Sequence, residues 1–293
     1  NTYMINIKEN ASDVKKAIKK YGAVGIMYSH NDNGYHYINN SYNDKTNNRA
    51  GHAVMVVGWD DNYSKDNFRD GVKPEKDGAW LIRNSWGDGT GSYYNQSYFW
   101  MSYETFSLSD TAWVFDFSAN DGYDNNYQVD GGLNVAHQSG YRKLANVFTT
   151  QTKQGVSSED LKAVSLSITS KTNVNYTIEI YTDLKDKTKP TSGTKQETAT
   201  TTGQTTYAGV YTIPLKAAVN LKPGTSYSVV VTTDTPAIDI EAAMTGDVNY
   251  NNEMVWENHA SSDNTASYYF YGAGLAYSRS WNYQNTHGNF CIK

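Results

Sequence analysis

In two short segments, a polar residue whose side chain can take part in catalysis lies at the edge of an apolar run. In residues 51–59 (GHAVMVVGW), His52 comes just before a run typical of a buried strand. In residues 80–87 (WLIRNSWG), Asn84 closes a second such run. A histidine oriented by an amide oxygen is the base of a cysteine-nucleophile triad. The two segments therefore predict a His–Asn pair that two neighbouring strands bring together.

Such a triad needs a thiolate, because the ionised sulfur is the nucleophile. The imidazolium beside it lowers the thiol pKa and later protonates the leaving amine. The sequence contains one cysteine, Cys291, which follows the Asn instead of preceding the His. Cys291 alternates with Phe290 and Ile292 in a predicted last strand, and free cysteines commonly pack as small apolar residues. We therefore interpret Cys291 as a core residue.

The elements expected around the pair follow from periodicity. Val14, Ala17, Ile18 and Tyr21 form one helical stripe, which predicts a helix over residues 9–22 that ends at a glycine. Apolar runs predict strands, and a hydrophilic stretch over residues 60–77 predicts a surface loop. The predicted strands cover residues 23–28, 53–59, 79–83 and 98–103.

Composition narrows the class of protein. The chain has 293 residues, 25 of them Tyr, and a net charge of −5, so the sequence shows no nucleic-acid footprint. No apolar run is long enough to cross a bilayer. The single cysteine excludes an internal disulfide framework. Abundant Tyr and Thr together with turn-forming Asn and Gly predict a β-rich protein with a polar surface.

Beyond residue 120 the sequence becomes a succession of short alternating runs separated by turns, which predicts a β-sandwich. We place the boundary between the two regions between Ser109 and Asn120. The strands expected in the second region cover residues 161–168, 176–181, 210–213, 227–231, 268–271 and 290–292.

The motifs around His52 and Asn84 resemble those of papain-like cysteine peptidases. GHAV (residues 51–54) is followed by VGW (57–59) and then by IRNSWG (82–87), and the similarity spans residues 4–106, the family's β-rich C-terminal half. The loop over residues 63–68 resembles the bacterial cell-surface branch, which carries a lectin-like domain. The resemblance implies a mainly β (α+β) fold, with a peptidase half-domain over 1–112 and a lectin-like, jelly-roll type sandwich over 117–293.

The resemblance also implies roles for individual residues. His52 would be the general base and acid, and Asn84 would orient it. Trp86 would shield the pair from water, although a tryptophan at this place is also explained as a core residue. Ala53 and Met27 would form walls of the pocket for the side chain before the scissile bond.

Two family elements have no counterpart in the sequence. The nucleophilic Cys of this family lies some ~130–150 residues before the His and Asn, which would place it on the order of 80–100 residues before Asn1. The glutamine of the oxyanion hole would be missing with it. We therefore expect that the true beginning of the protein is absent, and that the chain alone is inactive.

These observations support two hypotheses. The first is an extracellular or cell-surface bacterial cysteine endopeptidase, with a protein or peptide substrate and a missing N-terminal half as partner. The alternative is a carbohydrate- or cell-wall-binding adhesin with a vestigial peptidase domain, for which a cell-wall or host glycan would be the partner. Neither hypothesis involves nucleic acid or a membrane span.

No cofactor is required by either hypothesis. The histidines lack metal-ligand spacing, so zinc catalysis is not supported. Residues 116–126 are rich in oxygen donors and would suit a structural Ca²⁺, although a solvated interdomain loop explains them as well. Trp256 and Trp281 would either stack on sugar rings or belong to the core.

Overall fold

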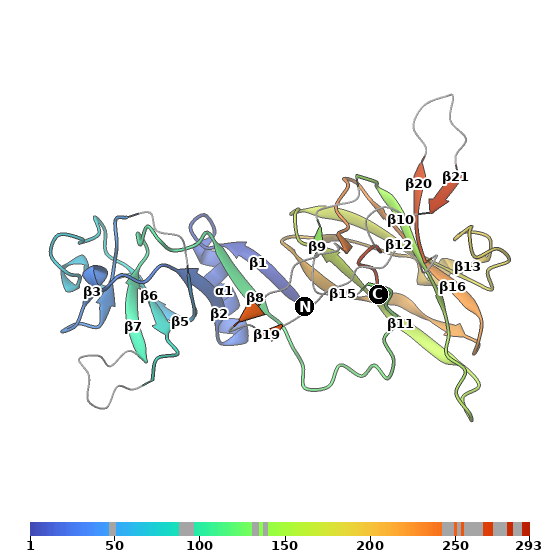
Figure 1. Cartoon of the computed structure of the whole chain (residues 1–293), viewed down its shortest axis with the longest axis horizontal. Helices are drawn as coiled ribbons and strands as arrows, with labels where there is room; N and C mark the ends of the chain where they lie inside the picture. Colours follow the sequence, from blue (N-terminus) through green and yellow to red (C-terminus); the bar gives the residue numbers. More distant parts are fainter. Residues whose placement is uncertain are drawn as a thin grey trace. The chain divides into compact units, whose positions relative to one another are not determined.

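The structure of the chain is a computed structural model, and it divides into two compact units (Figure 1). The N-terminal unit is Thr2–Phe117, and the C-terminal unit is Ser118–Lys293 together with Asn1. The structure describes residues 1–46, 51–87, 97–130, 135–136, 140–241, 249–250, 253–254, 266–271, 280–283 and 289–293.

The N-terminal unit is built on one sheet whose strands follow the order β1-β8-β2-β5-β6-β7-β4-β3. Neighbouring strands are antiparallel, except that β4 and β7 are parallel. Along β2 and the first half of β5, buried residues alternate with more exposed ones, as expected where one face of a sheet is covered. The strands are β1 (Thr2–Asn6), β2 (Val24–Tyr28), β3 (Tyr35–His36), β4 (Ser41–Tyr42), β5 (His52–Asp60), β6 (Ala79–Arg83), β7 (Tyr98–Ser102) and β8 (Thr111–Phe115).

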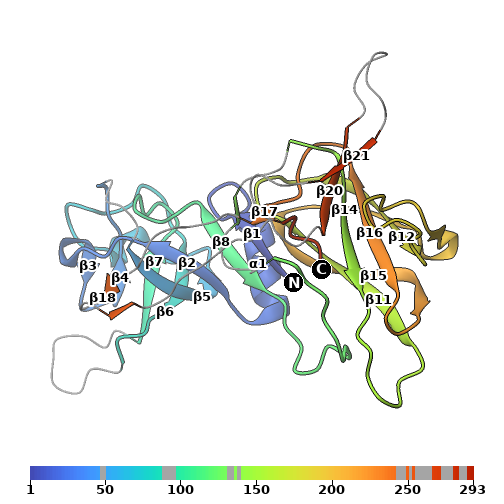
Figure 2. The same cartoon turned by 45° about the vertical axis from the view of Figure 1, so that its right-hand side comes forward.

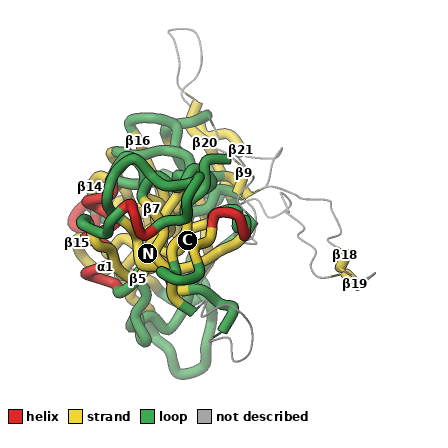
Figure 3. Tube along the Cα trace, turned by 90° about the vertical axis from the view of Figure 1, so that its left-hand side faces the viewer, coloured by secondary structure: helices red, strands yellow, loops and turns green. Residues whose placement is uncertain are grey.

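The predicted helix is observed as α1 (Ala11–Tyr21), which packs against β1, β2, β5 and β8. Val14, Ala17 and Ile18 are buried on one side of it, as the stripe predicts. The helix ends at Gly22, whose φ of 90° is left-handed and whose N–H donates to the Ile18 carbonyl. Figure 3 colours helices red and strands yellow, and it shows how small the helical part is.

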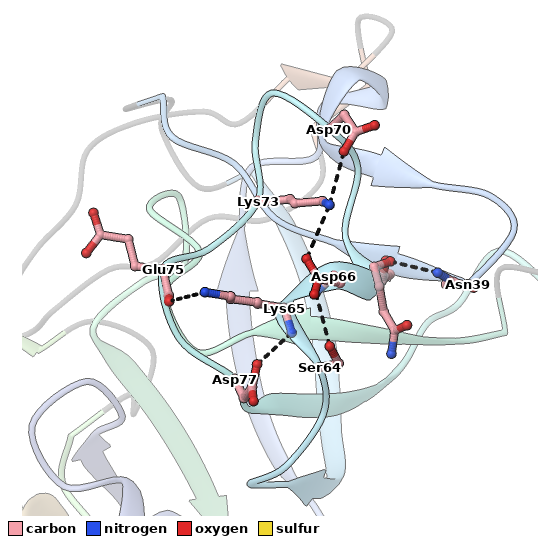
Figure 4. Close-up of polar contacts among 10 residues, drawn as sticks. Asn39, Ser64, Lys65, Asp66, Asp70, Lys73, Glu75 and Asp77 are labelled. Atoms are coloured by element: carbon pink, nitrogen blue, oxygen red, sulfur yellow. Dashed lines mark hydrogen bonds and ion pairs between the residues drawn. The ribbon is translucent and has the colours of Figure 1, made fainter.

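The connection between β5 and β6 is an ordered loop (Figure 4). It contains the 3-10 helix η2 (Lys65–Asn67) and the side chain of Phe68, which is buried. The Lys65 N–H donates to Asp77 at 2.9 Å, and Lys73 pairs with Asp66 at 3.3 Å. Asn39, which follows β3, donates to the Asn67 carbonyl at 3.1 Å. The predicted hydrophilic loop is therefore fixed at several points along its length.

The C-terminal unit is a β-sandwich (Figures 1 and 2). One sheet has the order β13-β12-β16-β10-β20-β21, with β14 also paired to β12, and β11 pairs with β15 in the facing layer. The main strands are β10 (Lys143–Thr149), β11 (Glu159–Ile168), β12 (Val174–Thr182), β13 (Thr194–Lys195), β14 (Thr201–Thr205), β15 (Ala208–Leu221), β16 (Ser226–Thr233), β20 (Ser267–Tyr271) and β21 (Ser280–Tyr283). The short elements are η1 (Asp32–Gly34) of the N-terminal unit, and β9 (Val135–Ala136), η3 (Glu197–Ala199), β17 (Ile240–Glu241), β18 (Asn249–Tyr250) and β19 (Glu253–Met254) of the C-terminal unit.

The core of the C-terminal unit lies between these layers. Ile178 of β12 and Val229 of β16 are examples from one sheet, and Leu166 of β11 is an example from the other. Leu166 also forms an isolated bridge to Ile292, so the last residues of the chain lie against β11. The prediction of a strand over residues 290–292 is wrong, because Phe290 and Ile292 each form only an isolated β-bridge.

Candidate active site

His52 is the first residue of β5, and the neighbouring strand β2 fixes its place. Its register partner is Tyr28, whose carbonyl accepts a hydrogen bond from the Gly51 N–H at 3.2 Å. The buried Tyr28 ring lies 5.7 Å from the imidazole, centre to centre. The imidazole itself is half-buried, so part of the ring is accessible at this strand end.

Asn84 directly follows β6, and the antiparallel pairing of β5 and β6 brings it beside the start of β5. Its Oδ1 accepts hydrogen bonds from His52 Nε2–H and from the Ser85 N–H, both at 2.8 Å. Two donors converge on this atom, which identifies it as the amide oxygen. Asn84 is only 4% exposed, so water competes little for the bond. With Nε2 engaged, Nδ1 is the nitrogen of His52 that can act as a base.

Trp86 lies on the ring of His52. The two ring centres are 4.6 Å apart and the planes differ by 17°, which is a stacked arrangement. Trp86 is 44% exposed, so it is not the core residue that the alternative interpretation describes. The indole therefore covers one face of the imidazole that Asn84 orients.

Met27 and Ala53 are direct register partners on β2 and β5. Ala53 is exposed and Met27 is half-buried, and neighbouring residues on the same strands, such as Val54 and Ile26, are buried. The two side chains thus share the more open face of the sheet, next to His52. Their role in binding a substrate side chain stays a prediction.

Cys291 lies in the C-terminal unit and is 6% exposed. Burial raises the pKa of its thiol far above the ordinary range, and the nearby charges of Asp130 and Asp239 act in the same direction. A thiol in this environment stays protonated and is a poor nucleophile. The interpretation of Cys291 as a core residue agrees with its burial.

His30 is a residue of this site to which the sequence motifs assign no role. His30 follows β2 by two residues, and its ring lies 4.7 Å from Trp86 at an angle of 89°. Two imidazoles therefore pack against one indole. The only local signal is that the strand that positions His52 also leads to His30; the contact itself depends on tertiary structure.

In the described parts of the chain, no group of three or more His, Cys, Asp or Glu side chains is placed to hold a metal ion. In the segment over residues 116–126, Asn120 Oδ1 accepts the Gly122 N–H and Asp121 Oδ1 accepts the Tyr123 N–H. Such local turns suit the loop interpretation, and the structural Ca²⁺ stays a prediction. None of the described helices has the length and apolar character needed to span a membrane.

Two protein families match the chain, and the gap between the two matches includes the boundary between the two compact units. Residues 127–293 match the lectin-like domain family, and residues 1–113 match the papain family of cysteine proteases. A search of curated proteins gave no significant match.

Two solved structures are similar over 99% of this chain. One is a variant of the clostridial cysteine protease Cwp84 after propeptide cleavage, with 27% sequence identity, a TM-score of 0.72 and 69% of that chain covered. The other contains the cysteine protease and lectin-like domains of Cwp84, a surface-layer associated protein of Clostridium difficile, with 26% identity, a TM-score of 0.68 and 62% of that chain covered. This chain thus spans less than two thirds of the second structure and slightly more of the first.

These matches confirm the predicted combination of a papain-like peptidase segment with a lectin-like sandwich in a mainly β fold. Over residues 127–293 the chain belongs to the lectin-like domain family, and its residues 1–113 are a segment of the papain family of cysteine proteases.

Proposed function

We propose that this chain supplies the base and its orienter to the Cys-His-Asn triad of a cysteine endopeptidase, with the lectin-like domain as an accessory module. The observation that carries the proposal is the 2.8 Å hydrogen bond from His52 Nε2–H to Asn84 Oδ1 at adjacent strand ends. Peptide is the substrate class that the papain-family segment implies.

In the proposed peptide hydrolysis each group has its own task. His52 Nδ1 holds the proton of the cysteine as an imidazolium, and Asn84 fixes the ring. The thiolate attacks the scissile carbonyl carbon, the C–N bond breaks, and His52 gives its proton to the leaving amine. A water molecule then loses a proton to His52 and attacks the thioester, the C–S bond breaks, and the imidazolium and thiolate are restored.

The thiol in this proposal comes from a papain-type segment outside these 293 residues. The only cysteine of the chain, Cys291, is buried with a raised thiol pKa. The two Cwp84 structures are also longer than the aligned part. We therefore expect the chain by itself to be inactive towards peptides.

An exposed apolar face of the N-terminal unit supports this view. It comprises Met27, Ala53, Met55 and Phe115, on the face of β2, β5 and β8 opposite to the buried core residues. Met55 on β5 is 37% exposed and Phe115 on β8 is 42% exposed, which is high for large apolar side chains on the two strands that flank β2. Such a patch marks an interaction surface. We propose that the thiol-bearing segment packs here, beside His52.

Reassembly tests the proposal. The chain is mixed with a separately produced thiol-bearing segment, and hydrolysis of a fluorogenic peptide is measured. We expect hydrolysis only when both parts are present. His52→Ala should lower the rate of hydrolysis on the order of 10⁴-fold or more. His36→Ala serves as the matched control because it removes a different histidine of the same unit. Equal activity of the His52→Ala mixture would show that the assignment is wrong.

The lectin-like domain supports a second candidate function. Its family match covers residues 127–293, more of the chain than the peptidase segment does. In this alternative the protein is a carbohydrate- or cell-wall-binding adhesin with a vestigial peptidase domain. A glycan array probed with the chain distinguishes the candidates: glycan binding without activity in the reassembly assay favours the adhesin.

An extracellular or bacterial cell-surface location is part of both candidates. It is supported by the surface-layer association of Cwp84, which is 26% identical. Immunoblotting of surface extracts and cytosol from the source bacterium tests it, and a protein found only in the cytosol would contradict it.

A further inference from the structure

Two histidines of the N-terminal unit share one tryptophan. His52 stacks on Trp86 with ring centres 4.6 Å apart, and His30 lies perpendicular to the same indole at 4.7 Å. The mechanism above uses only His52. A second titratable ring this close to the base affects both the position of the indole and the local charge.

His30 is held by two hydrogen bonds with defined directions. Its Nε2 lies 3.2 Å from Asp32 Oδ1, and its Nδ1 lies 3.0 Å from the Tyr28 hydroxyl. A carboxylate only accepts, so Nε2–H donates to Asp32. Burial raises the pKa of Tyr28 far above the ordinary range, so its hydroxyl keeps the proton and donates it to Nδ1. A neutral His30 satisfies every one of these groups.

Protonation of His30 disturbs this network. A proton on Nδ1 would face the hydroxyl proton of Tyr28, and the positive charge would lie near an imidazolium at His52. Burial is the main cause that lowers the pKa of His30, and the charge of His52 acts in the same direction, whereas Asp32 opposes both. His30 is therefore neutral at neutral pH and accepts a proton only in acid.

The neighbouring tyrosines of His30 do not change charge in mild acid. Tyr42 stacks on the imidazole with ring centres 5.5 Å apart, and burial raises its pKa well above the working range. Arg69 donates a hydrogen bond to the Asp32 carbonyl at 3.1 Å. Tyr35, with its ring 6.3 Å from His30, also has a raised pKa, of about 12. Among His30 and the two tyrosines, His30 is the group that takes up a proton in mild acid.

We propose that His30 is a positioning residue for the His52–Asn84 pair: as a neutral ring it holds the Trp86 indole on His52, and its protonation in acid loosens that stack. The inference rests on the proposed function for its catalytic meaning. Its physical content, the coupling of two imidazoles through one indole, can be measured without catalysis.

The test is an NMR titration of the 293-residue chain. The indole N–H resonance of Trp86 is assigned by its loss in Trp86→Phe, and the His30 ring resonances by their loss in His30→Gln. We expect the His30 midpoint below the ordinary 6.5, and a shift of the Trp86 resonance with the same midpoint. In His52→Gln the His30 midpoint should rise, because a nearby positive charge is gone.

Two further variants separate packing from protonation. His30→Phe keeps an aromatic ring between Tyr42 and Trp86 but cannot take up a proton, so the Trp86 resonance should stay at its neutral-pH position and lose the acid shift. His36→Gln is the matched control and should change neither titration. In the reassembled peptidase at neutral pH, His30→Gln should lower kcat on the order of tenfold with little change in KM, and His30→Phe should restore most of it.

The outcomes are distinct. An unchanged acid shift of Trp86 in both His30 variants overturns the inference, and so does a His30 midpoint that does not move in His52→Gln. If these titrations behave as expected but the reassembled chains never cleave peptide, the proposed function is wrong and the coupling of the two rings stands.

Discussion

The two units use polar side chains in opposite ways. In the N-terminal unit, His52 and Trp86 lie partly exposed at a strand end, and the buried Asn84 accepts hydrogen bonds from the His52 ring and from the Ser85 N–H. In the C-terminal unit, Cys291 and Asp239 are buried within or beside the apolar core, and Asp239 accepts hydrogen bonds from nearby chain segments. The comparison teaches that residue type alone does not identify a reactive group; access and an oriented partner do.

The largest effect is expected when one group is removed from each unit and hydrolysis by the reassembled peptidase is measured. Asn84→Ala should lower kcat/KM by about 10²–10³-fold, because His52 loses the acceptor that fixes its ring and tautomer. Cys291→Ala should leave kcat/KM unchanged. A large loss with Cys291→Ala would mean that the buried thiol takes part in the reaction.

Stability gives the second test. Ile178 is fully buried between the layers of the sandwich. The substitution Ile178→Ala should lower the free energy of unfolding by about 2–5 kcal/mol. Val210→Ala, at a position that is 39% exposed on β15, should change it by less than about 0.5 kcal/mol. Chemical denaturation followed by circular dichroism measures both. Equal effects of the two substitutions would contradict the described core.

The smallest expected effect concerns alkaline pH. The thiol of Cys291 stays protonated in the folded chain, whereas in the unfolded chain it ionises near its ordinary pKa of 9.0. The unfolded state therefore binds fewer protons above this pH, and stability should fall as pH rises, by at most about 1.4 kcal/mol per pH unit. Unfolding measured at several values between about pH 8 and 10 should show this fall in the natural chain and a weaker one in Cys291→Ala.

Much of the N-terminal unit was predictable because its signals are local. The stripe of Val14, Ala17 and Ile18 predicts α1, and the apolar run that begins after His52 predicts β5. The pairing of His52 with Asn84 was predictable because both lie at the ends of strands adjacent in sequence. The strands β1 and β8, which pair across opposite ends of the unit, were missed, although residues 111–115 (TAWVF) have the composition typical of a strand.

The C-terminal unit was predictable in class but not in detail. Alternation indicates strands, but β15 runs over Ala208–Leu221, far beyond the predicted residues 210–213, because its polar residues continue on the outer face. β10 was missed, although it is central in its sheet and buried along most of its length. The role of His30 could not be predicted either, since its contacts with Trp86 and Tyr42 join three separate segments.

The ordered loop between β5 and β6 has a consequence for resistance to proteolysis. A segment is cleaved when its backbone can leave its own hydrogen bonds and extend into another enzyme's cleft. Here the Val72 carbonyl is held by Asn43 at 2.5 Å and the Glu75 N–H by Glu104 at 2.6 Å. If the proposed function holds, these contacts should protect the long connection between His52 and Asn84 from digestion by neighbouring copies, and the pair would stay on one uncut chain.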